Sequence, residues 1–171
     1  MRENCLIYNM IREIKIYPNK ILSQKAKKVG VIDAETKKLI EDMVETLYAK
    51  GGAGLAANQV GVSKQIIVVD DSRGGGNVKI LINPKILRKR GKQVALEGCL
   101  SLPGLELEIK RPAKIEVEYL NKEGTKQKQK SEDLTARIIC HEIDHLDGKT
   151  ILDRVGFFKR LALKRKLKVK N

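Results

Sequence analysis

The sequence predicts an α+β fold with mainly antiparallel strand pairing. A helical pattern comes first, several short alternating segments follow, and a second long helical pattern lies near the end. Alternating βαβ units would instead interleave helices and strands along the chain. The 171 residues, of which 42% are apolar, suit one domain with its own core. We predict a single domain over residues 10–171, and we interpret residues 1–9 as a lead-in because Met10 offers a second start.

The first helix is predicted from Asp33 to about Lys50. Asp33 can cap its N-terminus, apolar residues recur inside it at helical spacing, and Gly51 ends it. The next ten residues, Gly52–Gly61, contain three glycines and are predicted to form a loop. No G-K-[ST] sequence follows, so a phosphate-binding loop is not expected.

Strands are predicted where apolar residues form short runs or alternate with polar residues. These segments are Gln65–Asp70, Val78–Asn83, Leu105–Ile109 and Ala113–Leu120. The first two are joined across Gly74-Gly75-Gly76, and a turn at residues 121–124 follows the last. A second long helix is predicted over Glu132–Asp147, closed by Gly148, and a third, basic helix from Phe157 to the end.

The net charge of +14 arises from 35 Lys and Arg against 21 Asp and Glu. Phe157–Asn171 carries seven Lys or Arg and no acid, and Lys85–Lys92 is a second basic run. A polyanionic partner would explain this excess, and so would a solvated surface in a lysine-rich, thermophilic proteome. The composition favours neither explanation.

The sequence also argues against several classes of protein. No apolar run approaches the roughly 20 residues that a bilayer helix needs, and no signal peptide is evident. The three cysteines, Cys5, Cys99 and Cys140, are too few and odd in number for a disulfide framework. We therefore expect a cytoplasmic protein with no membrane partner and no DNA partner.

The two histidines of the chain, His141 and His145, lie four residues apart in the pattern H-E-x-x-H. On a helix they share one face with Leu134 and Ile138, so both imidazoles can bind one metal ion. The alternative is a pair of buried, hydrogen-bonded histidines. The amphipathic helix around the motif favours the metal, and Glu142 between the histidines is placed to handle a water molecule.

A third protein ligand is usual for such a site. No third histidine exists and no glutamate follows Glu142, so Asp147, Asp153 and an upstream cysteine remain. Cys99 is the best candidate, because a flanking glycine permits a close approach and a thiolate suits a borderline metal. Taken alone, Cys99 would be a small buried apolar residue. Cys140, next to His141, turns away from the ligand face and is expected to pack in the core.

This ligand set predicts hydrolytic chemistry. A metal lowers the pKa of a coordinated water, and Glu142 can take its proton and return it to a leaving amine. A backbone N–H beside Cys99 and a nearby side-chain amide could stabilise the developing oxyanion.

Three segments resemble, in order and spacing, the three motifs of the peptide deformylase family. They are Gly52-Ala53-Gly54-Leu55-Ala56-Ala57-Asn58-Gln59, Glu97-Gly98-Cys99-Leu100-Ser101 and His141-Glu142-Ile143-Asp144-His145. The resemblance extends from about Met10 to about Arg154. It implies removal of the N-formyl group from the initiator methionine of nascent proteins, with release of formate. It also implies antiparallel sheets packed around a central H-E-x-x-H helix.

The resemblance implies a role for each matching residue. Cys99, His141 and His145 would bind the metal, Glu142 would be the general acid and base, and Gln59 with the backbone N–H of Leu100 would stabilise the oxyanion. Gly54 and its neighbours would offer backbone hydrogen bonds to the peptide, as an added strand would use. The substrate pocket would be formed by Ala53, Gly54, Glu97, Gly98, Leu134 and Ile138, together with His141.

The implied cofactor is one Fe²⁺ per chain, with Zn²⁺ or Ni²⁺ often replacing it in purified protein. The implied partners are N-formylmethionyl nascent peptides, and the basic C-terminal segment is expected to dock on ribosomal RNA. Two positions depart from the pattern of the family: Cys140 stands where many relatives have glutamine, and Glu106 stands near the place, shortly after the second motif, where several have an arginine that contacts the substrate. Arg111 and Asp144 are interpreted either as partners that orient the ligands or as an ordinary ion pair.

Two other functions are consistent with parts of the sequence. H-E-x-x-H alone is also typical of metallopeptidases, although the missing downstream ligand and the Cys99 motif count against one. The basic C-terminal segment would suit an RNA-binding protein with a structural metal. Glu142 argues against that hypothesis, since a structural site needs no base.

Overall fold

The computed structural model describes residues 10–72 and 76–169, and the predicted lead-in at residues 1–9, which includes Cys5, lies outside them. The helices are α1 (Ala34–Ala49), α2 (Asp133–Leu146) and α3 (Phe157–Val169), with short 3-10 helices η1 (Lys20–Ser23), η2 (Ala57–Val60) and η3 (Ile151–Arg154). The strands are β1 (Gly54–Ala56), β2 (Ile66–Val69), β3 (Lys79–Arg90), β4 (Gln93–Glu97), β5 (Leu107–Arg111), β6 (Lys114–Leu120) and β7 (Lys126–Glu132). The α+β prediction is confirmed.

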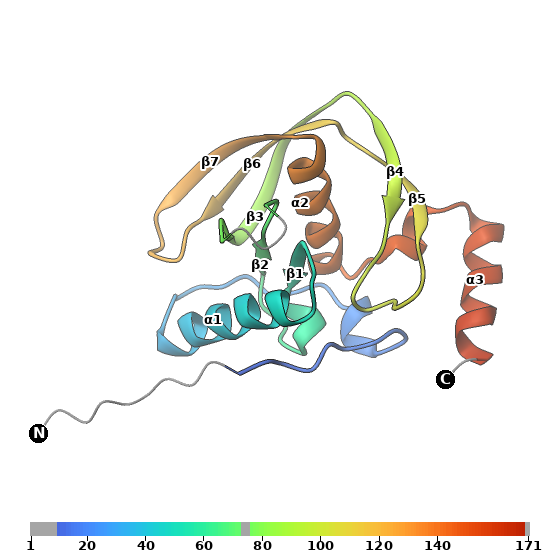
Figure 1. Ribbon diagram of the computed structural model, residues 1–171. Helices are drawn as coiled ribbons and strands as arrows, with labels where there is room; N and C mark the ends of the chain where they lie inside the picture. Colours follow the sequence, from blue (N-terminus) through green and yellow to red (C-terminus); the bar gives the residue numbers. More distant parts are fainter. Residues whose placement is uncertain (1–9, 73–75, 170–171) are drawn as a thin grey trace, which may run out of the picture.

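The strands form two antiparallel sheets, and α2 lies between them (Figure 1). One sheet has the strand order β1-β2-β3-β6-β7, and the other is the β4–β5 hairpin. Helix α2 packs against β1, β2, β6 and β7, and α1 packs against β1 and β2. The connection between β4 and β5 therefore approaches α2 from the side opposite the larger sheet.

Strand β2 explains how two helices share one sheet. All four of its side chains are buried. Ile67 and Val69 belong to the core beneath α2, whereas Ile66 and Val68 belong to the core beneath α1. Because successive side chains of a strand point to opposite faces, α1 and α2 cover opposite faces of the sheet at this strand.

Both long helices begin and end close to their predicted positions. The Asp33 carboxylate caps α1 by accepting a hydrogen bond of 2.8 Å from the Thr36 N–H. Helix α2 is followed by Gly148 with φ +71°, and a Cβ there would lie 2.8 Å from the carbonyl oxygen of Ser23. Glycine is therefore required where α2 turns back against η1.

The predictions for the strands are only partly correct. The prediction of a loop over Gly52–Gly61 is wrong, because that segment contains β1 and η2. Strands β4 and β7 were not expected, and β3 continues through the first part of the basic run to Arg90. Part of the predicted Gly74–Gly76 junction lies outside the described residues. The prediction of a single domain over residues 10–171 stays a prediction.

The predicted basic C-terminal helix is confirmed as α3, which stands at the edge of the molecule beside the β4–β5 hairpin (Figure 1). Its first two side chains, Phe157 and Phe158, are 64% and 84% exposed. Within residues 10–72 and 76–169, no helix combines the length and the apolar character needed to cross a bilayer.

Candidate metal centre and substrate pocket

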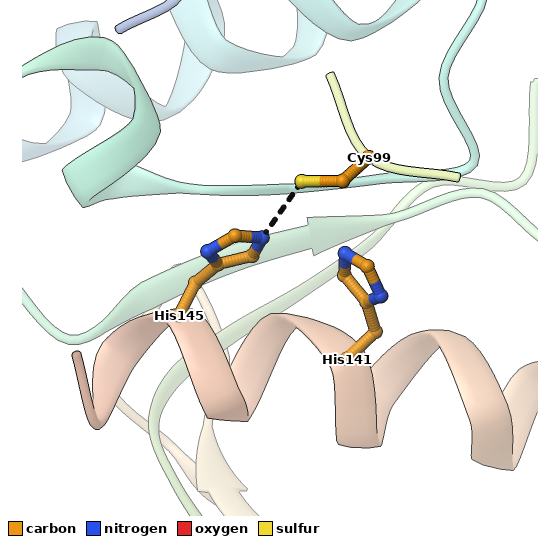
Figure 2. A group of neighbouring side chains, drawn as sticks. All are labelled: Cys99, His141 and His145. Atoms are coloured by element: carbon orange, nitrogen blue, oxygen red, sulfur yellow. Dashed lines mark hydrogen bonds between the residues drawn. The ribbon is translucent and has the colours of Figure 1, made fainter. Parts of the chain in front are cut away.

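The two histidines lie one turn apart on α2, and their rings extend toward Cys99 (Figure 2). Cys99 comes from the connection that follows β4. Its Sγ lies 3.2 Å from Nε2 of His145, and one ligand atom from each of the three residues lies within 4.8 Å of the others. Among the described residues this is the one cluster of Cys, His and carboxylate side chains that could hold a metal ion.

The donor set of this cluster fits a borderline transition metal. A thiolate and two imidazoles are typical ligands of Zn²⁺, Fe²⁺ or Ni²⁺, and three protein ligands leave a position for water or substrate. The structure does not bring the alternative ligands to this cluster. Asp147 and Asp153 are exposed, and their carboxylates pair with Lys25 and Arg160 instead.

The 3-10 helix η2 places two amides beside the metal ligands. Gln59 is buried, its Oε1 accepts a hydrogen bond of 2.8 Å from the Ala56 N–H, and its Nε2 lies 3.3 Å from Oγ of Ser101 and 3.7 Å from Sγ of Cys99. Asn58 donates from Nδ2 to the backbone carbonyl of His145. The segment that was predicted to be a loop thus contacts the connection that carries Cys99 and the backbone of α2 at His145.

Glu97 is the partner of the His141 ring. Its Oε2 lies 2.9 Å from Nδ1 of His141, which leaves Nε2 of that ring for a metal. Arg111 donates to both oxygens of Glu97, at 2.6 and 2.8 Å, and Arg137 donates to Oε1 at 2.5 Å. Burial alone would raise the pKa of Glu97, but hydrogen bonds from His141 and Arg111 outweigh it and lower the pKa to about 2.

Arg111 also connects Glu97 to Asp144, which directly precedes His145 in the H-E-x-x-H motif. It also donates to Oδ2 of Asp144, at 2.7 Å, and Arg154 donates to both oxygens of the same carboxylate. Arg111 and Asp144 are both buried. They form an ion pair, which is one of the two interpretations of the sequence. Arg111 also binds Glu97, and Glu97 contacts the His141 ring, so the pair is connected to a metal ligand.

Glu142 lies against the backbone of β1. It is buried, and its Oε2 has no hydrogen-bond partner among the described residues. A Cβ on Gly54 would lie 2.5 Å from Oε1 of Glu142 and 2.7 Å from Cγ2 of Ile138, so only glycine allows this approach. Burial raises the pKa of Glu142 to about 7, against the opposing effect of His141 and Arg111.

The pKa values of the two histidines are shifted in opposite directions. Burial alone would lower the pKa of His141, but hydrogen bonds with Cys99 and Glu97 outweigh it and raise the pKa to about 10. Burial, together with the positive charges of His141 and Arg111, lowers the pKa of His145 well below its usual value.

A pocket of about 410 Å³ opens beside the metal ligands. Its lining includes all six residues that were expected to contact the substrate: Ala53, Gly54, Glu97, Gly98, Leu134 and Ile138. It also includes Gln59, Cys99, Leu100, His141 and Glu142. A larger groove of about 750 Å³ along α1 contains none of these residues.

The family model for polypeptide deformylase matches residues 11–160. The chain belongs to the polypeptide deformylase family. It is therefore a hydrolase, and its resemblance to this family is confirmed. The peptide deformylase of Acetivibrio thermocellus is 48% identical over 145 residues, which are 85% of this chain and 84% of that protein.

Solved deformylase structures have the same fold. The crystal structure of a peptide deformylase from Legionella pneumophila is 37% identical, with a TM-score of 0.87 over 92% of this chain and 94% of that one. The deformylase of Ehrlichia chaffeensis in complex with actinonin is 39% identical, with a TM-score of 0.87 over 95% of this chain and 98% of that one.

Two arginines of the deformylase site were missed in the sequence. Arg137 lines the pocket, and Arg154 binds Asp144. A charged residue on an amphipathic helix is normally expected at the surface, so Arg137 gave no signal of burial. Its position four residues before His141 was the one available clue, since residues four apart share a helix face. Cys140 packs in the core beneath α2, as predicted.

Proposed function

We propose that this chain hydrolyses the N-formyl group from the N-terminal formylmethionine of newly synthesised proteins and releases formate. The observation that carries the proposal is the cluster of Cys99, His141 and His145 at one side of a pocket that also contains Glu142. Membership of the deformylase family supports the reaction, and the buried unpartnered oxygen of Glu142 supports a role for this residue in proton transfer.

We assign metal binding to Cys99, His141 and His145, with one Fe²⁺ per chain and Zn²⁺ or Ni²⁺ as replacements in purified protein. When bound, such a metal supplies a Lewis acid and a water molecule of lowered pKa. Glu97 holds the His141 ring through Nδ1, so the ring cannot turn away from Cys99.

The remaining residues of the site act on protons and charge. Glu142 takes the proton of the attacking water and delivers it to the amine that leaves. The Gln59 amide and the backbone N–H of Leu100 stabilise the negative charge on the formyl oxygen. Gln59 is prepared for this role because Ala56 fixes its carbonyl end and leaves the NH₂ group beside Cys99.

The pocket receives the methionine side chain. Leu134 and Ile138 contribute apolar surface on the α2 side, and Ala53 does so on the side of β1. Gly54 and Gly98 border the same pocket, and their backbone groups are suited to hydrogen bonds with an extended peptide. This substrate places the protein in the cytoplasm, where formylated chains emerge from the ribosome.

Release of formate tests this function directly. The protein should be purified anaerobically, its metal content measured, and formyl-Met-Ala-Ser compared with Met-Ala-Ser as substrates. We expect formate from the formylated peptide and no cleavage of either internal amide bond. Cleavage of internal bonds without formate would contradict the proposal and favour a peptidase.

We further propose that α3 docks on ribosomal RNA near the emerging chain. Its Lys and Arg side chains include Lys159, Lys164, Arg165 and Lys166, and no acidic residue lies within the helix. Deleting residues 157–171 should weaken ribosome binding in a manner that depends on salt and leave hydrolysis of the short peptide unchanged. Ribosome binding equal to that of the intact chain would mean that this segment is only a solvated surface.

A further inference from the structure

The pocket beside the metal ligands is bordered on one side by the free edge of β4. Within the described residues β4 pairs only with β5, and the pocket is lined by Leu96 at the end of β4 and by Gly98 directly after it. The backbone groups of an unpaired strand edge can bind an extended peptide as an added strand. Residues of the β4–β5 hairpin that lie next to this edge can therefore contact the part of a substrate that follows its first residue.

Glu106 lies next to Gly98 on the exposed side of the hairpin. The last pair of the ladder joins Glu97 to Leu107, so Gly98 and Glu106 come one step beyond it on the two strands. Leu107 is buried and Glu106 is exposed, as expected from the alternation of side chains along a strand. A Cβ on Gly98 would lie 3.9 Å from Cγ of Glu106, so the Glu106 side chain stands on the side of the hairpin that a side chain at position 98 would occupy.

The Glu106 carboxylate is not neutralised by the chain itself. It has no ion-pair or hydrogen-bond partner within residues 10–72 and 76–169, although the chain has 35 Lys and Arg. The charged or titratable side chains of the pocket lining are buried instead, and they are Glu97, Arg137, His141 and Glu142. Glu106 is thus an exposed negative charge beside the pocket, and a cation from outside the chain can approach it.

A basic side chain on a bound peptide has the length needed to reach Glu106. Neighbouring strands lie about 4.8 Å apart, so a peptide along the free edge of β4 would lie about 10 Å from the strand that follows Glu106. Gly98 has no side chain to fill the space between the two. Lys and Arg carry their charge at the end of a long side chain and can cross this space, whereas a shorter cation cannot.

We propose that Glu106 is a specificity-determining residue that binds a Lys or Arg side chain on one of the two residues that follow formylmethionine. The inference rests on the proposed deformylase activity. An ion pair that stays in contact with water contributes little, so the expected gain in kcat/KM is about two- to fivefold at low salt. This gain should decrease as the salt concentration rises, because salt screens exposed charges.

Peptides that differ in one side chain measure this preference through formate release. Lys and Gln are compared at the second residue, in formyl-Met-X-Ser, and at the third residue, in formyl-Met-Ala-X, with every peptide amidated at its C-terminus. At about 20 mM salt, the Lys-to-Gln ratio of kcat/KM should be about two to five at one of these positions. A ratio of about one at both positions, with formyl-Met-Ala-Ser still hydrolysed, overturns this inference alone. No formate from any of the peptides overturns the proposed function together with it.

The variant Glu106→Gln removes the charge, keeps the size of the side chain and should bring the Lys-to-Gln ratio to about one. A ratio equal to that of the unaltered chain overturns the inference. Glu41→Gln is the matched control, because Glu41 is also exposed and has no ion-pair partner among the described residues, but it lines the groove along α1. Its ratio should equal that of the unaltered chain, and an equal fall in both variants would mean that total charge acts instead of contact.

The length of the cation provides a second test in the unaltered chain. In a peptide with 2,4-diaminobutyrate in place of Lys, the positive charge is kept on a side chain that is two methylenes shorter. This peptide should lose the gain over Gln, because its ammonium group cannot reach across Gly98. Hydrolysis as fast as that of the Lys peptide overturns the inference, since the attraction would then not depend on contact with Glu106.

Discussion

Helices α1 and α2 each bury an aspartate, but the partners of the two carboxylates differ. Asp42 on α1 is 1% exposed and pairs with Arg12 and Lys38, whose side chains are 30% and 34% exposed. Asp144 on α2 pairs with Arg111, which is 3% exposed and continues to Glu97 and His141. A carboxylate whose partners reach water contributes stability, whereas one that is linked through a buried arginine to a metal ligand also fixes the geometry of that ligand.

Glu142 differs most from these two aspartates, because it is a buried carboxylate on α2 whose Oε2 has no hydrogen-bond partner within residues 10–72 and 76–169. The variant Glu142→Ala should lower formate release by roughly 10²–10⁴-fold, the usual contribution of a general acid or base. It should keep its metal, because Cys99 and both histidines are untouched. Turnover and metal content are measured on the same sample. Turnover equal to that of the unaltered chain would support a structural metal instead.

A change at Glu97 tests whether the buried contacts from Asp144 through Arg111 and Glu97 to His141 affect metal binding. The variant Glu97→Gln keeps the size of the side chain but removes the counter-charge of Arg137 and one of the two counter-charges of Arg111, which keeps Asp144, and it removes one acceptor. Metal affinity should fall by about 10- to 100-fold, as expected when a group that orients a ligand is lost. Competition with a chelator measures this affinity.

Glu132→Gln is the matched control for Glu97→Gln. Glu132 also pairs with a cation, Lys114, but both side chains are more than half exposed, at 56% and 58%. The metal affinity of this control should equal that of the unaltered chain. Equal losses in the two variants would show that the effect comes from total charge rather than from the contact with His141.

The sequence predicts the parts of the site that local patterns encode. Helix α2 follows from its apolar spacing and closing glycine, and the ligand face follows from the four-residue step between His141 and His145. Strand β7 has no such pattern, because Lys126–Ser131 alternates lysine with glutamine and serine, and its strand conformation depends on pairing with β6. Likewise, the burial of Arg137 depends on a hairpin that lies far away in the sequence.

The smallest expected effect is on stability, and it comes from Asp42, the buried aspartate of α1. Burial alone would raise the pKa of Asp42, but hydrogen bonds from Lys38, the Met10 N–H and Arg12 outweigh it and lower the pKa. A folded-state pKa below the unfolded value near 3.9 means that Asp42 stabilises the fold above that pH, and this contribution is lost as the pH falls through the folded pKa. Asp42→Asn should cost about 1–3 kcal/mol at pH 7.

Denaturant unfolding of Asp42→Asn and of the unaltered chain, at pH 7 and at about pH 3, tests this prediction. The unfolding midpoints of the two proteins should differ at pH 7 and converge at the lower pH, because Asp42 is then becoming protonated. Formate release at pH 7 should be unchanged, since Asp42 contacts neither the pocket nor the metal ligands. Glu13→Gln is the control, because Glu13 is 80% exposed and pairs with Lys15, two residues along the chain. A gap between Asp42→Asn and the unaltered chain that persists at low pH would mean that the buried side chain acts through packing rather than through its charge. That result would remove the contrast between the two helices, because the carboxylate on α1 would then not act as an ion pair at all.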